Sequence, residues 1–531
     1  MTGRIGIDFG TSNTTVALHD SVTGQAEAVI LDGVSLMQQG RGMPAASIPS
    51  LVSFEDGRPR WFGSEVIERN LLEDARTFKH MKKYLVRFKD IERPMPDGSR
   101  VSARAAAEAY VLRVLELAAS SFGGVDEEVA FTLPVESFEF YDDWIRQVAR
   151  KAGITRVRTL DEASAAALGN GIKIQAGDVF LVFDFGGGTL DTSLVKIEDE
   201  DSGSSQGAKC RVLGKGGVDL GGTTIDTWLM EEFLRVNSRS SADPAIRRMS
   251  HELLARCERA KEDLTTSDSA SIETQDPHTG KVYRAEITRG RFEDLLLERG
   301  LFKGIENALR TADRNASRQD FGIDDAKKVI LVGGSSVIPS VQQHIERRFG
   351  AERVERVDPI LTVAKGAASF ASGIDFYDHI QHEYAIGHIN PETNKRELVT
   401  IVRAGEPYPM DDPFIRTVTP VRNGETRLRL DIFEISANGK APVDWETEIQ
   451  FDQDGCLRLV KPTLAVVQDR ASFHMNKGAE TFLVADPPAE LGRPRFEVQF
   501  TVDNSKRLLV TADDLDREVR VLDRVPVVEL T

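Results

Sequence analysis

The pattern of apolar and polar positions changes once along the chain. Up to about residue 374, short apolar runs such as V-F-L-V-F-D (179–184) and V-I-L-V-G-G (329–334) alternate with segments whose apolar residues recur at helical spacing, for example Ile246, Met249 and Leu253. Short apolar runs between amphipathic segments are typical of buried strands in an α/β sheet. The pattern therefore predicts an α/β domain over residues 1–374.

After about residue 384 the apolar residues follow a period of two. Leu428, Leu430 and Ile432 alternate with charged neighbours, and turn-forming residues such as N-G (423–424) and D-Q-D-G (452–455) punctuate the stretch. This is the pattern of half-buried antiparallel strands joined by hairpins. It predicts an all-β second half.

The two patterns give a domain plan. We expect a linker at residues 375–384 and a β-sandwich at residues 385–531. Within the linker, Phe376, Tyr377 and Ile380 could dock against the α/β domain by burying apolar surface. The chain ends shortly after the strand-like E-V-R-V-L (518–522), so we expect no long helix behind the sandwich.

Composition and charge narrow the classes of function. The 531 residues include 67 Lys and Arg against 84 Asp and Glu, a net charge of −17. Such a surface repels phosphate backbones and anionic lipids, so we expect neither nucleic acid nor membrane as a partner.

Three scattered cysteines, Cys210, Cys257 and Cys456, fit a reducing compartment. Without an apolar stretch long enough for a signal peptide or a membrane span, the sequence predicts a cytoplasmic protein.

One short motif occurs twice. I-D-F-G-T-S-N-T-T-V-A-L (7–18) is echoed by F-D-F-G-G-G-T-L-D-T-S-L (183–194), and each copy suggests a strand, an Asp, a tight Gly turn and a second strand. Glycines in such a turn let the backbone approach an anion, and hydroxyl side chains add donors. The glycines are Gly10, Gly186, Gly187 and Gly188, and the hydroxyl residues are Thr11, Ser12 and Thr189.

The aspartates of the two copies add a metal to this prediction. Asp8 and Asp184 each stand where a strand ends and could hold a hydrated Mg²⁺ that offsets phosphate charge. One such turn alone could equally be a flexible loop, but two copies after buried strands favour a pair of hairpins that clamp a nucleotide. The sequence contains neither a P-loop motif nor a G-x-G-x-x-G that opens a helix.

The two turns belong to an ordered set of motifs that resembles the ATPase domain of the 70-kilodalton heat-shock (DnaK-type) chaperones. The other motifs are L-D-E-A-S-A-A-A-L-G-N-G (160–171), V-D-L-G-G-T-T-I-D (218–226), A-R-C-E-R-A-K-E-D-L (255–264) and V-I-L-V-G-G-S-S-V-I-P (329–339). The hairpins are shared with the actin and sugar-kinase branches of this superfamily, whereas the C-E-R-A-K segment resembles the heat-shock branch alone.

The resemblance implies a two-lobed, actin-like fold with ATP or ADP and Mg²⁺ between the lobes. By position, Asp8 and Asp184 would act around the metal, while Glu162 and Asp191 would help to orient metal and water. The implied phosphate contacts are Gly10, Thr11, Ser12, Gly186, Gly187, Gly188 and Thr189, and those at the adenosine end are Gly222, Glu258, Lys261, Thr265, Gly333, Gly334 and Ser335. The family's catalytic lysine most resembles Lys82, with Lys79 and Lys83 as rivals within the same eight residues (78–85).

The chain also departs from the family pattern. The family places one arginine directly after the lysine of the C-E-R-A-K segment and another after its G-G-S-T tetrad, where this chain has Glu262 and Val337. Each missing arginine removes a cation–π contact worth about 0.5–2 kcal/mol, so we expect weaker ATP binding or looser base selectivity. Ile360 stands where the family has an acidic residue.

The implied function is a slow, chaperone-like ATPase whose β-domain binds extended protein segments under the control of the nucleotide. In the family a helical lid covers the peptide groove, and we expect none here. This expected absence and the missing arginines also admit an adaptor dedicated to one partner protein, with little or no turnover, and a co-chaperone or exchange factor could act on either. A small-molecule kinase is disfavoured because it would have no role for the C-E-R-A-K segment or the β-domain.

Overall fold

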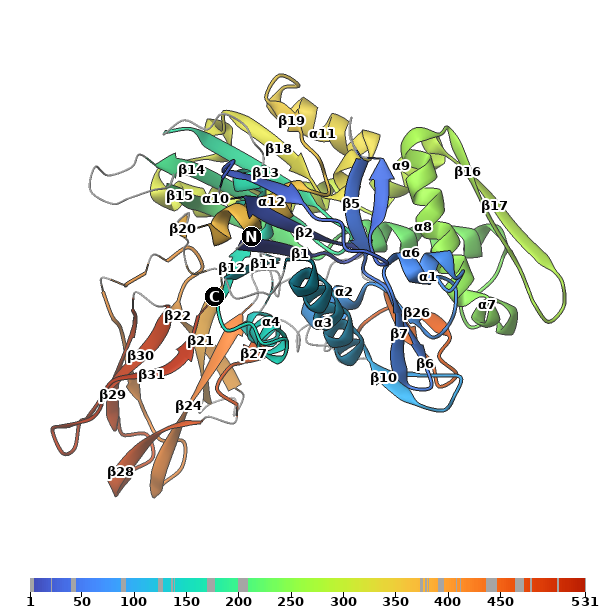
Figure 1. Cartoon of the computed structure of the whole chain (residues 1–531). Helices are drawn as coiled ribbons and strands as arrows, with labels where there is room; N and C mark the ends of the chain where they lie inside the picture. The colour runs from blue at the N-terminus through green and yellow to red at the C-terminus, as the bar shows by residue number, and fades with distance from the viewer. Residues whose placement is uncertain are drawn as a thin grey trace. The chain divides into compact units, whose positions relative to one another are not determined.

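The fold comes from a computed structural model of the whole chain (Figure 1). It describes residues 4–20, 22–39, 44–86, 92–122, 128–134, 137, 139–169, 177–198, 209–372, 376–377, 380, 382–389, 396–406, 408–410, 412–435, 447–463, 472–477, 480–503 and 506–530. The chain forms two compact units. Unit 1 comprises Met1–Tyr377 and Val443–Pro462, and unit 2 comprises Asp378–Pro442 and Thr463–Thr531.

Unit 1 is built on two large sheets of related topology. The first has seven strands: β12 (Val157–Asp161), β11 (Val129–Leu133), β1 (Arg4–Phe9), β2 (Asn13–Asp20), β5 (Pro44–Pro49) and β4 (Leu36–Gln39) in order, with β3 (Gln25–Ala28) paired to β2. The second has six: β19 (Val354–Arg356), β18 (Lys328–Val332), β13 (Val179–Phe185), β14 (Leu190–Glu198), β15 (Lys209–Val218) and β20 (Phe376–Tyr377).

The two sheets repeat one local arrangement. β1 and β13 each turn back into an antiparallel neighbour and each pair in parallel with a later strand on the other side. The predicted apolar runs form β13 and β18, which are buried along almost their whole length. The α/β prediction for this part of the chain is confirmed.

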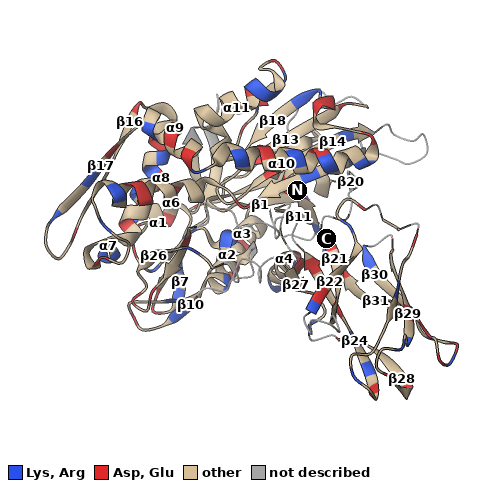
Figure 2. Cartoon of the chain, turned by 180° about the vertical axis from the view of Figure 1, so that it is seen from behind, with Lys and Arg blue, Asp and Glu red and all other residues tan. Residues whose placement is uncertain are grey.

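Smaller elements complete unit 1. Its helices are α1 (Ser64–Glu68), α2 (Met81–Val86), α3 (Ala103–Phe122), α4 (Glu139–Lys151), α5 (Glu162–Gly169), α6 (Gly222–Val236), α7 (Pro244–Arg248), α8 (Ser250–Thr266), α9 (Arg289–Glu298), α10 (Leu301–Ala316), α11 (Pro339–Phe349) and α12 (Thr362–Ala371). Its small sheets are β6 (Val52–Glu55) with β7 (Arg58–Phe62) and β8 (Thr77–Phe78), β9 (Glu92–Pro94) with β10 (Arg100–Ser102), and β16 (Ser269–Gln275) with β17 (Val282–Thr288). Figure 2 shows acidic and basic residues interspersed along these helices. Within the described ranges, no helix combines the length and apolarity that crossing a membrane requires.

Helices α5 and α12 pack against each other with almost no space between their backbones. A Cβ at Gly366 of α12 would collide with the carbonyl oxygen of Ala165 in α5, and a Cβ at Gly169 would collide with that of Thr362. Gly6 of β1 is pressed against Ala368 of α12 in the same way. These glycines let α12 approach both α5 and the first sheet.

We therefore expect Gly366→Ala to destabilise the protein by about 1–3 kcal/mol, because the new methyl group meets rigid backbone. Gly290→Ala in α9 is the matched control, since a Cβ there has no atom within 4 Å and alanine favours the helix. Urea unfolding of both variants measures the difference. Equal midpoints for Gly366→Ala and the wild type would contradict the packing.

Residues 443–462 differ from the predicted domain plan. The sequence assigned them to the sandwich at 385–531, but β25 (Glu448–Phe451) and β26 (Leu457–Val460) belong to unit 1. The reason is packing: Leu457 is buried in the second-sheet core, and Ile449, Phe451 and Leu459 pack against it. The predicted turn at D-Q-D-G (452–455) does connect two strands, and Gly455 takes its left-handed position with φ of +76°.

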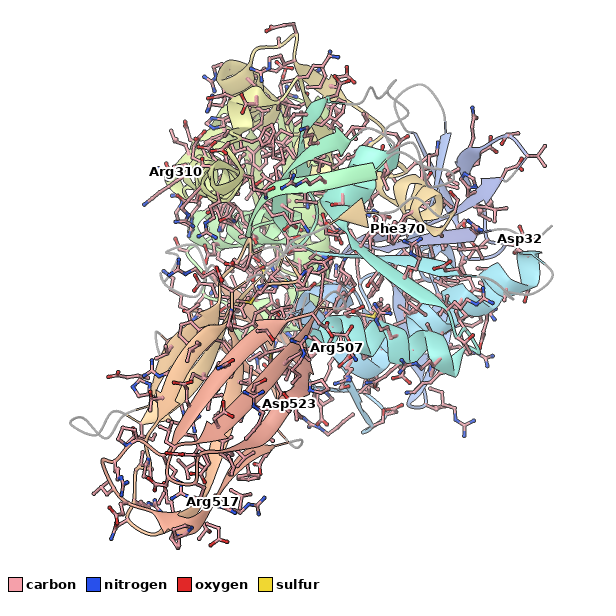
Figure 3. All side chains as sticks on the ribbon, turned by 90° about the vertical axis from the view of Figure 1, so that its left-hand side faces the viewer. Asp32, Arg310, Phe370, Arg507, Arg517 and Asp523 are labelled. Carbon is pink, nitrogen blue, oxygen red and sulfur yellow. The ribbon has the colours of Figure 1, made fainter. Side chains whose placement is uncertain are left out.

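Unit 2 consists of two antiparallel sheets, and the predicted β-rich second half is confirmed. One sheet contains β22 (Arg396–Val402), β21 (Glu383–Ile389), β24 (Glu425–Ile435), β27 (Ser472–His474) and β28 (Thr481–Ala489). The other contains β23 (Phe414–Val418), β29 (Phe496–Val502), β30 (Arg507–Asp514) and β31 (Val519–Glu529), and Figure 3 labels Arg517 at the turn between the last two. The alternating residues of β24 and β29 face one shared core.

The predicted linker is divided between the two units. The backbone of Phe376 and Tyr377 pairs with β15 and so extends the second sheet of unit 1. Ile380 is 1% exposed and lies in the core of unit 2. The expectation that Ile380 docks on the α/β domain is therefore wrong, since its apolar side chain is already buried elsewhere. Residues 373–375, 378–379 and 381 of this region lie outside the described residues.

Candidate functional site

The two duplicated turns lie directly opposite each other. A Cβ at Gly187 would be 2.7 Å from the Oγ of Ser12, and a Cβ at Gly188 would be 2.6 Å from the Oγ1 of Thr11. Glycine at these two positions is what permits so close an approach of the turns. The predicted phosphate-binding residues are thus brought together from both sheets of unit 1.

Each turn is held by its own strands. Across the second hairpin Asp184 is paired in register with Asp191, and the amide of Gly186 donates to the carbonyl oxygen of Thr189 at 3.0 Å. In the first hairpin the hydroxyl of Thr132 on the neighbouring strand β11 donates to Asp8 Oδ1 at 2.8 Å. The turns therefore rest on buried, rigid sheet rather than on free loops.

Four charged side chains interact beside these turns: Asp8, Lys82, Glu162 and Asp184. Lys82 is 4% exposed and forms an ion pair with Glu162 at the start of α5. Burial, reinforced by the charge of Glu162, raises the pKa of Asp8 from 3.8 to about 6. Burial and the charges of Glu162 and Asp8 also raise the pKa of Asp184 well above its ordinary value.

The lysine of this cluster is itself stabilised in its charged form. Burial alone would lower the pKa of Lys82, but the charges of Glu162 and Asp8 outweigh burial and raise the pKa. Three carboxyl groups facing one lysine leave an excess of negative charge. The cluster therefore favours a further cation.

The three candidate lysines have different partners. Lys82 faces Glu162, whereas the ammonium of Lys79 lies 3.7 Å from Glu258 and that of Lys83 donates to the Thr223 hydroxyl at 2.8 Å. The structure thus brings Lys82 together with Asp8, Asp184 and Glu162, and directs its two rivals toward α8 and α6.

A divalent cation would fit this cluster through its water shell. In the described part of the chain, no three His, Cys, Asp or Glu side chains converge closely enough to ligate a bare ion. Burial, and after it the charge of Glu162, raises the pKa values of Asp8 and Asp184, so a cation beside them would stabilise their charged forms. This combination suits Mg²⁺, which keeps several waters and takes few protein ligands.

The predicted adenosine-end residues gather behind the second turn. Ser335 donates from its hydroxyl to the carbonyl oxygen of Gly186 at 2.8 Å, and the amide of Gly222 donates to the same oxygen at 3.1 Å. Gly333 has φ of +79°, and a Cβ there would lie 2.5 Å from Asp184 Oδ1. Gly334 has no atom within 4 Å of its Cβ position, which leaves that position open.

Helix α8 carries three further predicted residues. Lys261 forms an ion pair with the buried Asp226 at 2.8 Å, and Thr265 donates to the carbonyl oxygen of Lys261. Burial pushes the pKa of Glu258 upward, but its hydrogen bond with His80 and the charge of Lys79 outweigh burial and lower it. These contacts tie α8 to α6 and to residues 79–80.

Two contributors to the site were not predicted. Thr132 holds Asp8, and Asp226 holds Lys261. Asp226 ends the V-D-L-G-G-T-T-I-D motif, four residues after Gly222, so helical spacing could have placed it on the same face. Nothing local to Thr132 indicates its role, because its neighbour Asp8 is 124 residues away.

Comparison with known proteins agrees with this geometry. Residues 4–375 match a family model described as Hsp70 protein. Among curated proteins, the chain is 26% identical over 541 residues to the chaperone protein DnaK of Deinococcus deserti, which covers 97% of this chain and 77% of that protein. It is 26% identical to the DnaK of Trichormus variabilis (96% and 70% covered) and 27% identical to an HscA homolog of Azoarcus sp. (97% and 76% covered).

Proposed function

The chain belongs to the Hsp70 family of chaperone ATPases, and on this premise we propose that it hydrolyses ATP slowly between the two duplicated turns and uses the nucleotide state to control protein binding by unit 2. The observation that carries the proposal is the close opposition of Thr11 and Ser12 with Gly187 and Gly188 beside four interacting charged side chains. We propose that unit 1 is the ATPase domain and that unit 2 is the binding domain.

Each part of the site has a role in this proposal. The amides and hydroxyls of both turns bind the β- and γ-phosphates, and Asp8 and Asp184 hold hydrated Mg²⁺, which neutralises phosphate charge when bound. Lys82 adds a positive charge near the γ-phosphate, while Glu162 and Asp191 orient water. Phosphoryl transfer to water needs mainly such positioning and charge neutralisation, so no covalent nucleophile is required.

The binding function is assigned to the antiparallel sheets of unit 2. Strand edges there can hydrogen-bond an extended peptide backbone, and spaces between the loops can accept its apolar side chains. The nucleotide would act by shifting the population of two conformations of different peptide affinity. Co-chaperones or exchange factors would act on the same equilibrium.

The experiment is to measure phosphate release from ATP and Mg²⁺ and, in parallel, binding to an array of extended apolar peptides with and without ATP. We expect measurable turnover and ATP-dependent release of several peptides. Turnover with no peptide binding would refute the coupling, and phosphate transfer to a sugar or an acid instead of water would refute the hydrolase itself. Calorimetric titrations with ATP and, separately, with GTP test the weaker ATP binding or looser base selectivity expected from Glu262 and Val337.

A further inference from the structure

A hairpin that leaves unit 2 in the sequence lies on unit 1 in the structure. β25 and β26 follow β24 and precede β27, both strands of unit 2, yet the hairpin packs beside β7 and α7 (Figures 1 and 2). We call residues 52–102 flank 1, residues 222–298 flank 2, and residues 447–460 the bridging hairpin. Flank 1 carries Lys82, and flank 2 carries Glu258 and Lys261, so each flank contributes residues to the proposed nucleotide site.

The bridging hairpin is anchored on flank 2 by polar contacts. Arg247 donates to Asp452 at 2.8 Å and to Asp454 at 2.7 Å, and the amide of Leu457 donates to the Ser250 hydroxyl at 3.0 Å. Leu457 is buried in the second-sheet core of unit 1, so the anchor combines ion pairs with apolar burial.

His251 joins the anchor to the hairpin tip. Its Nε2 lies 2.9 Å from the carbonyl oxygen of Gly455, and its ring stacks on Phe451. Burial, aided by the charge of Arg93, lowers the pKa of His251 to about 4, so the ring is neutral at pH 7 and its Nε2 proton is donated to Gly455.

The same hairpin tip also reaches flank 1. The guanidinium of Arg93 lies 4.2 Å from the ring centre of Phe451 and 4.2 Å from that of Phe78, so it is sandwiched between the hairpin and flank 1. Arg93 is 3% exposed, and it donates to the carbonyl oxygens of Ala75 and Thr77. A Cβ at Gly455 would stand 3.0 Å from the carbonyl oxygen of Pro94, so the tip lies against flank 1 backbone.

We propose that the bridging hairpin is an intramolecular clamp that holds flanks 1 and 2 together and slows the release of nucleotide. Opening the flanks requires Phe451 to leave Arg93 or His251, and Gly455 to leave Pro94. The flanks also contact each other directly, for example through Lys79 and Glu258. The clamp adds to these direct contacts.

The inference rests on the proposed nucleotide site, and its test has two readouts. The first is the release rate of a fluorescent ADP from wild type, Phe451→Ala, and the double variant Asp452→Asn/Asp454→Asn. We expect release about 3- to 30-fold faster for Phe451→Ala, from the loss of one desolvated cation–π contact. Phe302→Ala is the control, because Phe302 packs on the same core from α10, where it contacts His344.

The second readout needs no nucleotide. Spin labels on Arg58→Cys in flank 1 and Val282→Cys in flank 2, with Cys210 and Cys456 replaced by Ser, report the distance between the flanks. We expect a longer and broader distance distribution for Phe451→Ala and for the double variant, but not for Phe302→Ala. Unchanged distances in folded Phe451→Ala would overturn the clamp. Failure of the wild type to bind ADP would instead overturn the proposed nucleotide site, and the distance measurement alone would then decide whether the hairpin holds the flanks together.

Discussion

Asp8→Asn should sharply lower ATP turnover and at the same time raise the midpoint of thermal unfolding of the nucleotide-free protein. The substitution keeps the Oδ1 atom that accepts from Thr132 but removes a buried charge that Glu162 and Asp184 oppose. We expect turnover to fall about 100-fold or more, as for loss of a preorganised electrostatic group. The midpoint should rise by roughly 2–5 °C at pH 7.5.

The pH dependence of this gain follows from the pKa of Asp8. Folding raises that pKa from 3.8 to about 6, so the folded state binds the proton more tightly than the unfolded state. The stability that the protonated group contributes is complete below pH 3.8 and is lost as the pH rises through 6. The advantage of Asp8→Asn should therefore be largest at pH 7.5 and should shrink toward pH 5.

Scanning calorimetry at several pH values, with phosphate release from ATP, measures both effects. Asp32→Asn is the control, because Asp32 is exposed on unit 1 (Figure 3) and its substitution should change neither quantity. A variant that loses turnover without any gain in stability would show that Asp8 is not strained in the nucleotide-free state. A variant that keeps turnover would remove Asp8 from the metal site.

The duplicated turns could be predicted because their information is local. A strand, an Asp and a Gly turn lie within a dozen residues, and the repeat of this motif at 183–194 already indicated that the two copies act together. The structure adds what no local pattern contains, namely that Gly188 faces Thr11. Lys82 could not be distinguished from Lys79 and Lys83 by sequence, because the partners of these lysines are distant in the chain. Glu258, the partner of Lys79, is 179 residues away.

The position of the bridging hairpin, unlike that of the duplicated turns, could not be predicted from local sequence. Ile449, Phe451, Leu457 and Leu459 alternate with polar residues as in any strand of a sandwich. Alternation predicts that one face of a strand is buried, but it carries no information about which core covers that face. The same ambiguity explains Ile380, whose apolar side chain was expected on unit 1 and lies in the core of unit 2.

Lys82→Ala should cost both turnover and stability, in contrast to Asp8→Asn. Without the ammonium group, Glu162 and the two aspartates lose the positive charge that faces them. Removing one partner of a buried ion pair typically destabilises by about 3–5 kcal/mol, and protonation of a carboxyl can recover part of this. We expect turnover to fall about 100-fold, because Lys82 would also no longer compensate the γ-phosphate.

The two neighbouring lysines supply matched controls for this prediction. Lys79→Ala and Lys83→Ala remove the same charge within four residues, but from contacts with Glu258 and Thr223. They should alter nucleotide affinity and leave at least a tenth of the turnover. If Lys79→Ala or Lys83→Ala instead reproduced the full loss, the catalytic assignment would pass to that residue.

A double variant separates the two roles of Lys82. Lys82→Met with Glu162→Gln removes both charges of the pair and fills similar volume, so urea unfolding should return toward the wild-type midpoint. Turnover should stay low, since neither the cation nor the water-orienting carboxylate is restored. Recovery of stability without turnover would show that the Lys82–Glu162 pair is retained for phosphate chemistry, because an uncharged pair would hold the fold equally well. Recovery of both would mean that Lys82 acts only through folding.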